Sequence, residues 1–315
     1  MLKWSLRIGG GLIAAVVLVI AGVLISFWIW SANHSRELRA ESQIASTALG
    51  DIEYAVAGEG VPYLQLHGTP GGYDQVLIGR KVSPEEFEGV RIIAVSRPGY
   101  LRTPLESGRT FEEQADLYAA LLDELGIDEV VVYASSGGGY SGVQFALRHP
   151  DRCLALVLYA PAYGYEPFPE DGVPGGLSTD VMNWAISGPL LGMLAPLFLD
   201  ESIELDDTKI AAFRLLLRSV IPNADRRAGI ENDFRQRADR AVDAWPVERI
   251  EVPTLILHGD ADENTDYARS AELAARMLNA RFVTFEGGDH LIVVTRADEV
   301  RAEVNAFVDS VLAGN

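Results

Sequence analysis

The chain has 315 residues, of which 48% are hydrophobic and 23% charged, a balance typical of a globular protein rather than a disordered one. A formal net charge of −19 argues against nucleic acid as a partner, because phosphate backbones repel an acidic surface. The single cysteine, Cys153, excludes an intramolecular disulfide and a cysteine-based metal cluster.

An uncharged segment lies close to the N-terminus, between Ile8 and Trp30. As a helix it is long enough to cross a hydrocarbon layer of about 30 Å. Trp28 and Trp30 stand at its end, and indole side chains favour the membrane interface. A cleaved signal peptide is the alternative, but its apolar region is shorter and ends in a small-residue cleavage site. We therefore predict a transmembrane anchor over residues 1–30 that enters the lipid bilayer through residues 8–30.

Positive charges flank this segment on both sides. Lys3 and Arg7 precede it, and Arg36 and Arg39 follow it. The terminal amine adds a further charge before the segment, so the positive-inside rule favours a cytoplasmic N-terminus. The remainder of the chain would then lie outside the cytoplasm, joined to the anchor by a polar linker over residues 31–47.

Beyond the linker, short β-rich runs alternate with amphipathic helical patterns. The pattern over 110–126 is typical of a helix, because Thr110 and Glu113 have capping-box spacing and Gly126 follows. Further helices are predicted over 140–150, 267–280 and 296–312. Strands are predicted over 51–58, 62–68, 90–100, 128–134, 153–160, 252–262 and 281–290. Such alternation predicts an α/β protein with a parallel sheet.

The middle of the chain lacks a clear strand pattern. Residues 164–243 contain proline-rich loops and helical stretches, and we predict a helical cap over the edge where parallel sheets bind ligands. Its apolar stretches over 190–199 and 211–220 would line a pocket or pack on each other. The core would then comprise residues 48–163 and 244–315.

A tight turn of small residues follows the predicted strand over 128–134. Ala134, Ser136 and Gly138 match the small-x-nucleophile-x-small pattern of a nucleophile elbow between a strand and a helix. Centring the pattern on Ser135 would place the bulky Tyr133 in a small position. Ser136 is therefore the candidate nucleophile, and its backbone is expected in a sparsely populated region. A plain glycine–serine loop would not explain the flanking strand and helix.

A serine nucleophile needs a base, and the chain has five histidines. His34 borders the anchor, and His67 opens the sequence HGTPGG. His149 is expected to cap helix carbonyls, and His258 ends a strand as a structural residue. His290 remains as the base, because its glycine-flexed loop follows the last strand at the same sheet edge.

The base needs an orienting acid, and the reaction needs donors for a developing negative charge. Asp262, with Asp260 as the alternative, follows the strand before His290. Backbone N–H groups of Gly137 and Thr69 are the candidate oxyanion hole. For the HGTPGG segment that carries Thr69, an ordinary Pro-Gly turn is the alternative.

These motifs occur in the order HGTPGG, SRPGYLRTP, ASSGGG, cap, HGDAD and GGDH. Over residues 48–312 the chain resembles the α/β-hydrolase fold superfamily, in the branch that includes proline iminopeptidase-like enzymes and esterases. That resemblance implies a mostly parallel sheet with helices on both faces, a helical cap, and a triad in the order Ser136, Asp262, His290. The chain departs from the pattern at Ala134 and Leu101, which each replace a glycine, and at Ser96, which replaces an acid.

We therefore predict a membrane-anchored serine hydrolase that cleaves an ester or amide of a small molecule through an acyl-enzyme, without cofactor or metal. A serine argues against haloalkane dehalogenases and epoxide hydrolases, which use an aspartate there. Two alternatives keep the triad: carbon–carbon bond hydrolysis, and cofactor-free perhydrolysis with haloperoxidase-like activity. A third alternative is a non-catalytic binding protein on the same fold.

Overall fold

A computed structural model describes residues 2–188, 191–194 and 205–314 of the chain, without the side chains of residues 2–13, 192 and 194. One eight-stranded sheet runs in the order β1-β2-β4-β3-β5-β6-β7-β8. Strands β3 to β8 are parallel, whereas β2 is antiparallel to both β1 and β4. The strands are β1 Gln43–Thr47, β2 Gly50–Ala57, β3 Val61–Leu66, β4 Val90–Val95, β5 Val130–Ser135, β6 Cys153–Tyr159, β7 Thr254–Gly259 and β8 Ala280–Phe285.

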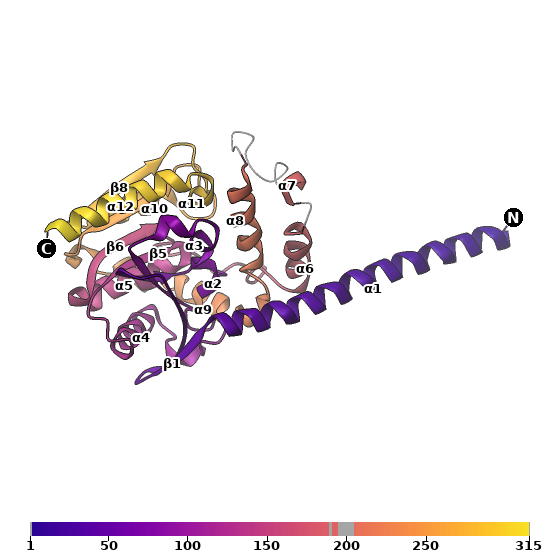
Figure 1. Cartoon of the computed structure of the whole chain (residues 1–315), viewed down its shortest axis with the longest axis horizontal. Helices are drawn as coiled ribbons and strands as arrows, with labels where there is room; N and C mark the ends of the chain where they lie inside the picture. Colours follow the sequence, from indigo (N-terminus) through magenta and orange to yellow (C-terminus); the bar gives the residue numbers. More distant parts are fainter. Residues whose placement is uncertain (1, 189–190, 195–204, 315) are drawn as a thin grey trace.

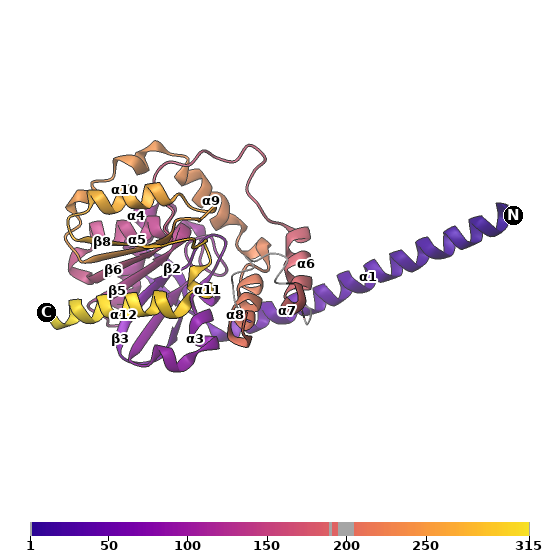
Figure 2. The same ribbon diagram turned by 90° about the horizontal axis from the view of Figure 1, so that it is seen from above.

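Helices cover both faces of this sheet, as Figure 2 shows. Helices α4, α5 and α10 pack on one face, and α2, α11 and α12 pack on the other, while α3 packs against α8 of the cap. The predicted mostly parallel sheet with helices on both faces is confirmed. The helices are α1 Leu2–Glu41, α2 Tyr73–Val76, α3 Ile78–Val82, α4 Phe111–Glu124, α5 Gly139–Arg148, α6 Leu177–Ile186, α7 Leu191–Leu194, α8 Asp207–Arg218, α9 Arg227–Arg237, α10 Tyr267–Arg276, α11 Ile292–Thr295 and α12 Ala297–Gly314.

Local sequence accounts for the central elements. The apolar runs of β5, β6 and β7 are buried because helices cover them on both sides. Helix α4 begins at a complete capping box, in which Thr110 accepts from the Glu113 N–H and the Glu113 carboxylate accepts from the Thr110 N–H.

The parallel strands all end at one edge of the sheet, and the cap stands at that edge. Helices α6 to α9 lie in the chain between β6 and β7, and Figure 1 shows α6, α7 and α8 beside the sheet rather than within its layers. The loops after β3, β5, β7 and β8 therefore meet beneath the cap, and they carry the candidate site residues.

The structure differs from the polar linker expected over residues 31–47. Helix α1 continues without a break to Glu41, and residues 43–47 form the edge strand β1. The helix end is held by the core, because the Tyr73 hydroxyl donates to the Leu38 carbonyl (2.6 Å) and Ser42 donates to Glu53 (2.7 Å). Polar composition alone gave no sign of these contacts.

Helix α1 also packs against the cap. Phe27 is only 1% exposed, and its ring lies 5.8 Å from that of Trp184 in α6. Trp30 stacks on His34, and the guanidinium of Arg218 in α8 lies 5.6 Å from the Trp30 ring. The helix thus holds a fixed position against both core and cap, and its N-terminal part extends away from them (Figure 1).

Candidate active site

Ser136 follows β5 directly and has a backbone conformation that side-chain-bearing residues rarely adopt. Its φ is +47°, in the left-handed region, as the elbow pattern predicted. A short 3-10 turn, Ser136–Gly138, then leads into α5.

The residues around Ser136 must be small because backbone and side-chain atoms of neighbouring segments lie very close to them. A Cβ at Gly138 would lie 2.7 Å from the carbonyl oxygens of Leu66 and His67. A Cβ at Gly142 would lie 2.7 Å from the Cβ of Ala134. Alanine at 134 is thus accommodated because its neighbour in α5 has no side chain.

The loops after β7 and β8 bring Asp262 and His290 together. His290 Nδ1 lies 2.7 Å from Asp262 Oδ2. Asp260, the alternative acid, instead accepts from the Gly287 N–H through Oδ1 (2.6 Å) and so supports the neighbouring turn. Of the two carboxylates, Asp262 is the one that contacts the histidine.

Two residues that the sequence did not assign to the site hold the Asp262 carboxylate. Its Oδ2 lies 3.0 Å from His258 Nε2 and accepts from the Thr265 hydroxyl at 2.8 Å. Burial by itself raises the pKa of Asp262, but hydrogen bonds from His258 and His290, the His290 charge and the Thr265 N–H outweigh it. The pKa of Asp262 therefore lies well below its usual range, and the carboxylate stays ionised. The four-residue spacing from His258 to Asp262 was the only sequence signal for this contact.

Tyr159 positions the loop that carries His290. Its hydroxyl donates to the His290 carbonyl oxygen and accepts from the Val293 N–H (3.2 Å). The end of β6 thus fixes the backbone on both sides of the turn into α11.

Ser136 and His290 line the same cavity, which has a volume of about 680 Å³ and lies between α8 and the sheet. Among the described residues no hydrogen bond joins their side chains. Hydrogen bonds of this kind commonly tighten only when substrate binds.

Gly137 and Thr69 are close neighbours, as a shared oxyanion hole requires. A Cβ on Gly137 would lie 3.2 Å from Thr69 N and 2.3 Å from Thr69 Oγ1. Within the described part of the chain, the Thr69 N–H donates to no other group. It is therefore available to a bound oxygen atom.

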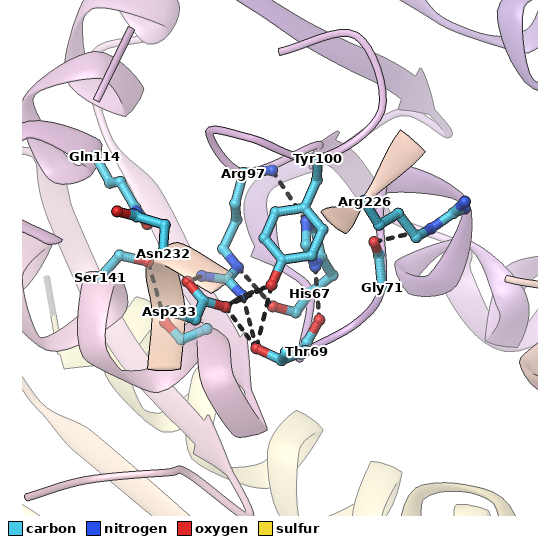
Figure 3. A network of polar contacts seen from close by, with 12 residues as sticks. His67, Thr69, Gly71, Arg97, Tyr100, Gln114, Ser141, Arg226, Asn232 and Asp233 are labelled. Atoms are coloured by element: carbon cyan, nitrogen blue, oxygen red, sulfur yellow. Dashed lines mark hydrogen bonds and ion pairs between the residues drawn. The ribbon is translucent and has the colours of Figure 1, made fainter. Parts of the chain in front are cut away.

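A buried polar network holds the Thr69 loop against the cap (Figure 3). Arg97 and Asp233 are almost inaccessible to solvent and form a two-pronged ion pair at 2.5 and 3.0 Å. Asp233 Oδ2 also accepts from the hydroxyls of Thr69 (2.5 Å) and Tyr100 (2.6 Å). Sequence reasoning missed Asp233, which lies in α9.

A second buried ion pair joins the same two regions. Arg226, at the start of α9, donates to the Gly71 carbonyl at 3.2 Å and pairs with Asp74 at 3.2 Å. Burial raises the pKa of Asp74, while the charge of Arg226 opposes that rise. The HGTPGG loop is thus fixed by the cap at two points.

The remaining histidines have structural partners. The buried His67 accepts from the Arg97 N–H at Nε2 (3.0 Å), so Nδ1 carries the proton and donates to the Gly68 carbonyl. Burial, and then the Arg97 charge, lower the pKa of His67 well below its usual value. His149 is the C-cap residue of α5 and donates its backbone N–H to the Phe145 carbonyl (2.8 Å), while its side chain pairs with Asp116 (2.8 Å).

The acid that is missing at Ser96 is supplied from another strand. Glu53 of β2 is 1% exposed and accepts from the Ser96 hydroxyl at 2.9 Å. The same carboxylate pairs with Arg102 at 2.6 Å. Among the described residues, no group of three or more His, Cys, Asp or Glu side chains is arranged to hold a metal.

Comparison with known proteins places this architecture in a family. The sequence profile of the "Alpha/beta hydrolase family" matches residues 66–303. A non-heme haloperoxidase of Rhodococcus erythropolis is 27% identical, over 82% of this chain and 96% of that protein. A 2-hydroxy-6-oxononadienedioate/2-hydroxy-6-oxononatrienedioate hydrolase of Dechloromonas aromatica is 25% identical, over 85% of this chain and 96% of that protein.

A shorter match has higher identity. The uncharacterized hydrolase YcgS of Bacillus subtilis is 40% identical over 116 residues, which are 35% of this chain and 37% of that protein. Among solved structures, an alpha/beta hydrolase fold protein from Nakamurella multipartita superposes with a TM-score of 0.74 at 31% identity. That superposition covers 87% of this chain and all of that one. The chain therefore belongs to the alpha/beta hydrolase family, as its motifs predicted, and is an enzyme of the serine hydrolase type.

Proposed function

We propose that the protein is a membrane-anchored serine hydrolase that cleaves an ester or amide bond with Ser136, His290 and Asp262. One observation carries the proposal: His290 is hydrogen-bonded to a buried, ionised Asp262 at the wall of the cavity that Ser136 also lines. The positive φ of Ser136 supports its role as the nucleophile.

The geometry supports the following sequence of steps. Nδ1 of His290 faces Asp262, which leaves Nε2 to take the proton as the Ser136 hydroxyl attacks the carbonyl carbon. The Gly137 and Thr69 N–H groups would hold the oxyanion. The leaving group takes the proton from Nε2, and water then hydrolyses the acyl-enzyme by the reverse proton path.

The cavity supports an ester with an apolar acyl group. Its described lining includes Val76, Ile78, Ala212, Leu216 and Val220. Three of these lie in the stretch over 211–220, whereas the stretch over 190–199 lies mostly outside the described residues. An aminopeptidase would need an available cap carboxylate at the cavity. Asp206 lines the cavity but lies 3.9 Å from Lys209, and Glu166 is paired with Arg237 at 2.8 Å.

Helix α1 supports the membrane anchor. By length and composition it can cross a bilayer, and Val16 to Ile20 are each more than half exposed. We propose that the enzyme body lies outside the cytoplasm. Protease added to sealed cells would then digest the body, and a protected body would contradict this orientation.

Two related reactions remain alternatives on the same triad. Similarity to a haloperoxidase favours perhydrolysis, and similarity to a hydrolase of oxo-dienedioates favours carbon–carbon bond cleavage. A non-catalytic binding protein on this fold is a weaker alternative, because the three triad side chains are all present.

Labelling with a fluorophosphonate probe tests the proposal. Wild type and Ser135→Ala should be labelled, and Ser136→Ala should not. A panel of p-nitrophenyl esters and aminoacyl-arylamides then separates esterase from peptidase activity. Equal labelling of Ser136→Ala and wild type would contradict the assignment.

A further inference from the structure

The floor of the cavity carries two neutral polar side chains that have no hydrogen-bond partner among the described residues. Gln65 is 8% exposed and is the penultimate residue of β3, directly beside Tyr133 of β5 in the sheet register. Both line the cavity, and among the described residues no hydrogen bond joins either side chain to another residue. Their polar atoms are accessible from the cavity, so a bound ligand can hydrogen-bond to both.

Strand β5 sets the distance of Gln65 and Tyr133 from the proposed nucleophile Ser136. Tyr133 precedes Ser136 by three residues, which is about 10 Å of chain at roughly 3.3 Å per residue. Ser135, two residues after Tyr133 on the same face, also lines the cavity. An acyl group held at Ser136 and directed along the sheet would therefore reach Gln65 and Tyr133 with its far end.

Positive charges that line the cavity are already neutralised. Lys209 lies 3.9 Å from Asp206, Arg296 is paired with Glu299, and Arg301 is paired with Glu86 and Asp298. Burial also keeps the Tyr133 phenol neutral, because it raises the pKa of that group. Among the described lining residues, the Gln65 amide and the Tyr133 phenol thus offer hydrogen bonds without carrying a charge.

We propose that Gln65 and Tyr133 form a polar subsite for a neutral hydroxyl or carbonyl group at the far end of the substrate's acyl chain. The inference rests on the proposed function of Ser136 and narrows it to one class of acyl group. It disfavours acyl groups that end in a carboxylate, such as those named for the dienedioate hydrolase relative.

Matched esters test the subsite in the full-length chain. We would compare kcat/KM for p-nitrophenyl 6-hydroxyhexanoate and 8-hydroxyoctanoate with that for hexanoate and octanoate, and with mono-p-nitrophenyl adipate. At one chain length or the other, the hydroxylated ester should be preferred over its parent by about tenfold, the effect of one neutral hydrogen bond. The adipate ester should be the poorest substrate of the three six-carbon esters.

Variants assign the preference to the two residues. Gln65→Leu and Tyr133→Phe should each bring the ratio of hydroxylated to parent ester towards one. Tyr54→Phe removes a hydroxyl outside the cavity and should leave the ratio unchanged. The rate of fluorophosphonate labelling reports whether each variant keeps an intact site, and Gln65→Met replaces Gln65→Leu if that variant does not fold.

Three results would overturn the subsite: no preference for the hydroxyl at either length, a preference for the adipate ester, or a preference that survives both substitutions. Failure of the proposed function looks different. In that case Ser136→Ala would hydrolyse hexanoate and octanoate esters as fast as wild type, whatever the preference between hydroxylated and parent esters.

Discussion

The Thr69 hydroxyl donates a 2.5 Å hydrogen bond to Asp233, which joins the loop after β3 to helix α9 of the cap across 164 residues of sequence. Arg97 completes the arrangement through its two-pronged ion pair with Asp233. The proposed oxyanion donor at Thr69 is therefore positioned by a carboxylate of the cap.

Replacing Asp233 should affect stability and catalysis together. In Asp233→Asn the buried Arg97 loses its ionised partner, which typically costs about 3–5 kcal/mol. We expect denaturant titration to show this loss and kcat to fall more than KM rises. Glu231→Gln is the matched control on α9, because its ion pairs with Arg227 and Arg235 are partly exposed and worth under about 1 kcal/mol. Equal effects of the two substitutions would contradict the positioning role.

A methyl group at position 137 should disrupt the proposed oxyanion hole. Its Cβ would lie 2.3 Å from Thr69 Oγ1, so Thr69 must move away. We expect Gly137→Ala to lower kcat by roughly 10²–10³-fold, the effect of losing one oxyanion donor. Gly314→Ala, with open space at its Cβ, should leave the kinetics unchanged. A fully active Gly137→Ala enzyme would place the oxyanion hole elsewhere.

Asp262 should contribute to stability in a pH-dependent way. The pKa of Asp262 is lowered in the folded chain, so its contribution is fully present above the unfolded value of about 3.9. It decreases as the pH falls through the lower folded value. We expect the difference in unfolding free energy between wild type and Asp262→Asn to shrink as the pH falls below about 4. A difference that grows as the pH falls from about 4 to 2 would contradict this sign.

Helix α1 should stabilise the cap through Phe27. This side chain is 1% exposed and meets Trp184, so Phe27→Ala should cost about 3 kcal/mol in detergent-solubilised protein. Ile29 is 60% exposed two residues along the helix, and Ile29→Ala is the matched control. The transition temperature of thermal unfolding measures the effect of both substitutions. Equal transition temperatures for the two variants would show that the contact between α1 and α6 does not support the cap.

Much of the fold could be predicted because its signals are local. The apolar run before Ser136, and the small residues after it, specify a strand, a sharp turn and a helix within about 20 residues. Asp262 and His290 follow later strands, and the ends of parallel strands share one edge. Their 2.7 Å contact could therefore be anticipated from chain order.

Other parts depend on contacts between distant segments. Asp233 lies in a polar helix without any motif, and its pairing with Arg97 follows only once α9 has folded onto the loop after β3. The same holds for Glu53, which occupies the place of the acid missing at Ser96. The composition of residues 31–41 is polar, yet these residues remain helical because Leu38 and Ser42 are held by the core.

The most direct test of the central assignment is the mass of a trapped covalent intermediate. Brief incubation with a p-nitrophenyl ester, acid quench and peptide mapping should place one acyl group on Ser136 in wild type. His290→Ala should form this adduct far more slowly. An acyl group found on Ser135 or on another residue, or equal acylation of Ser136→Ala, would contradict the account.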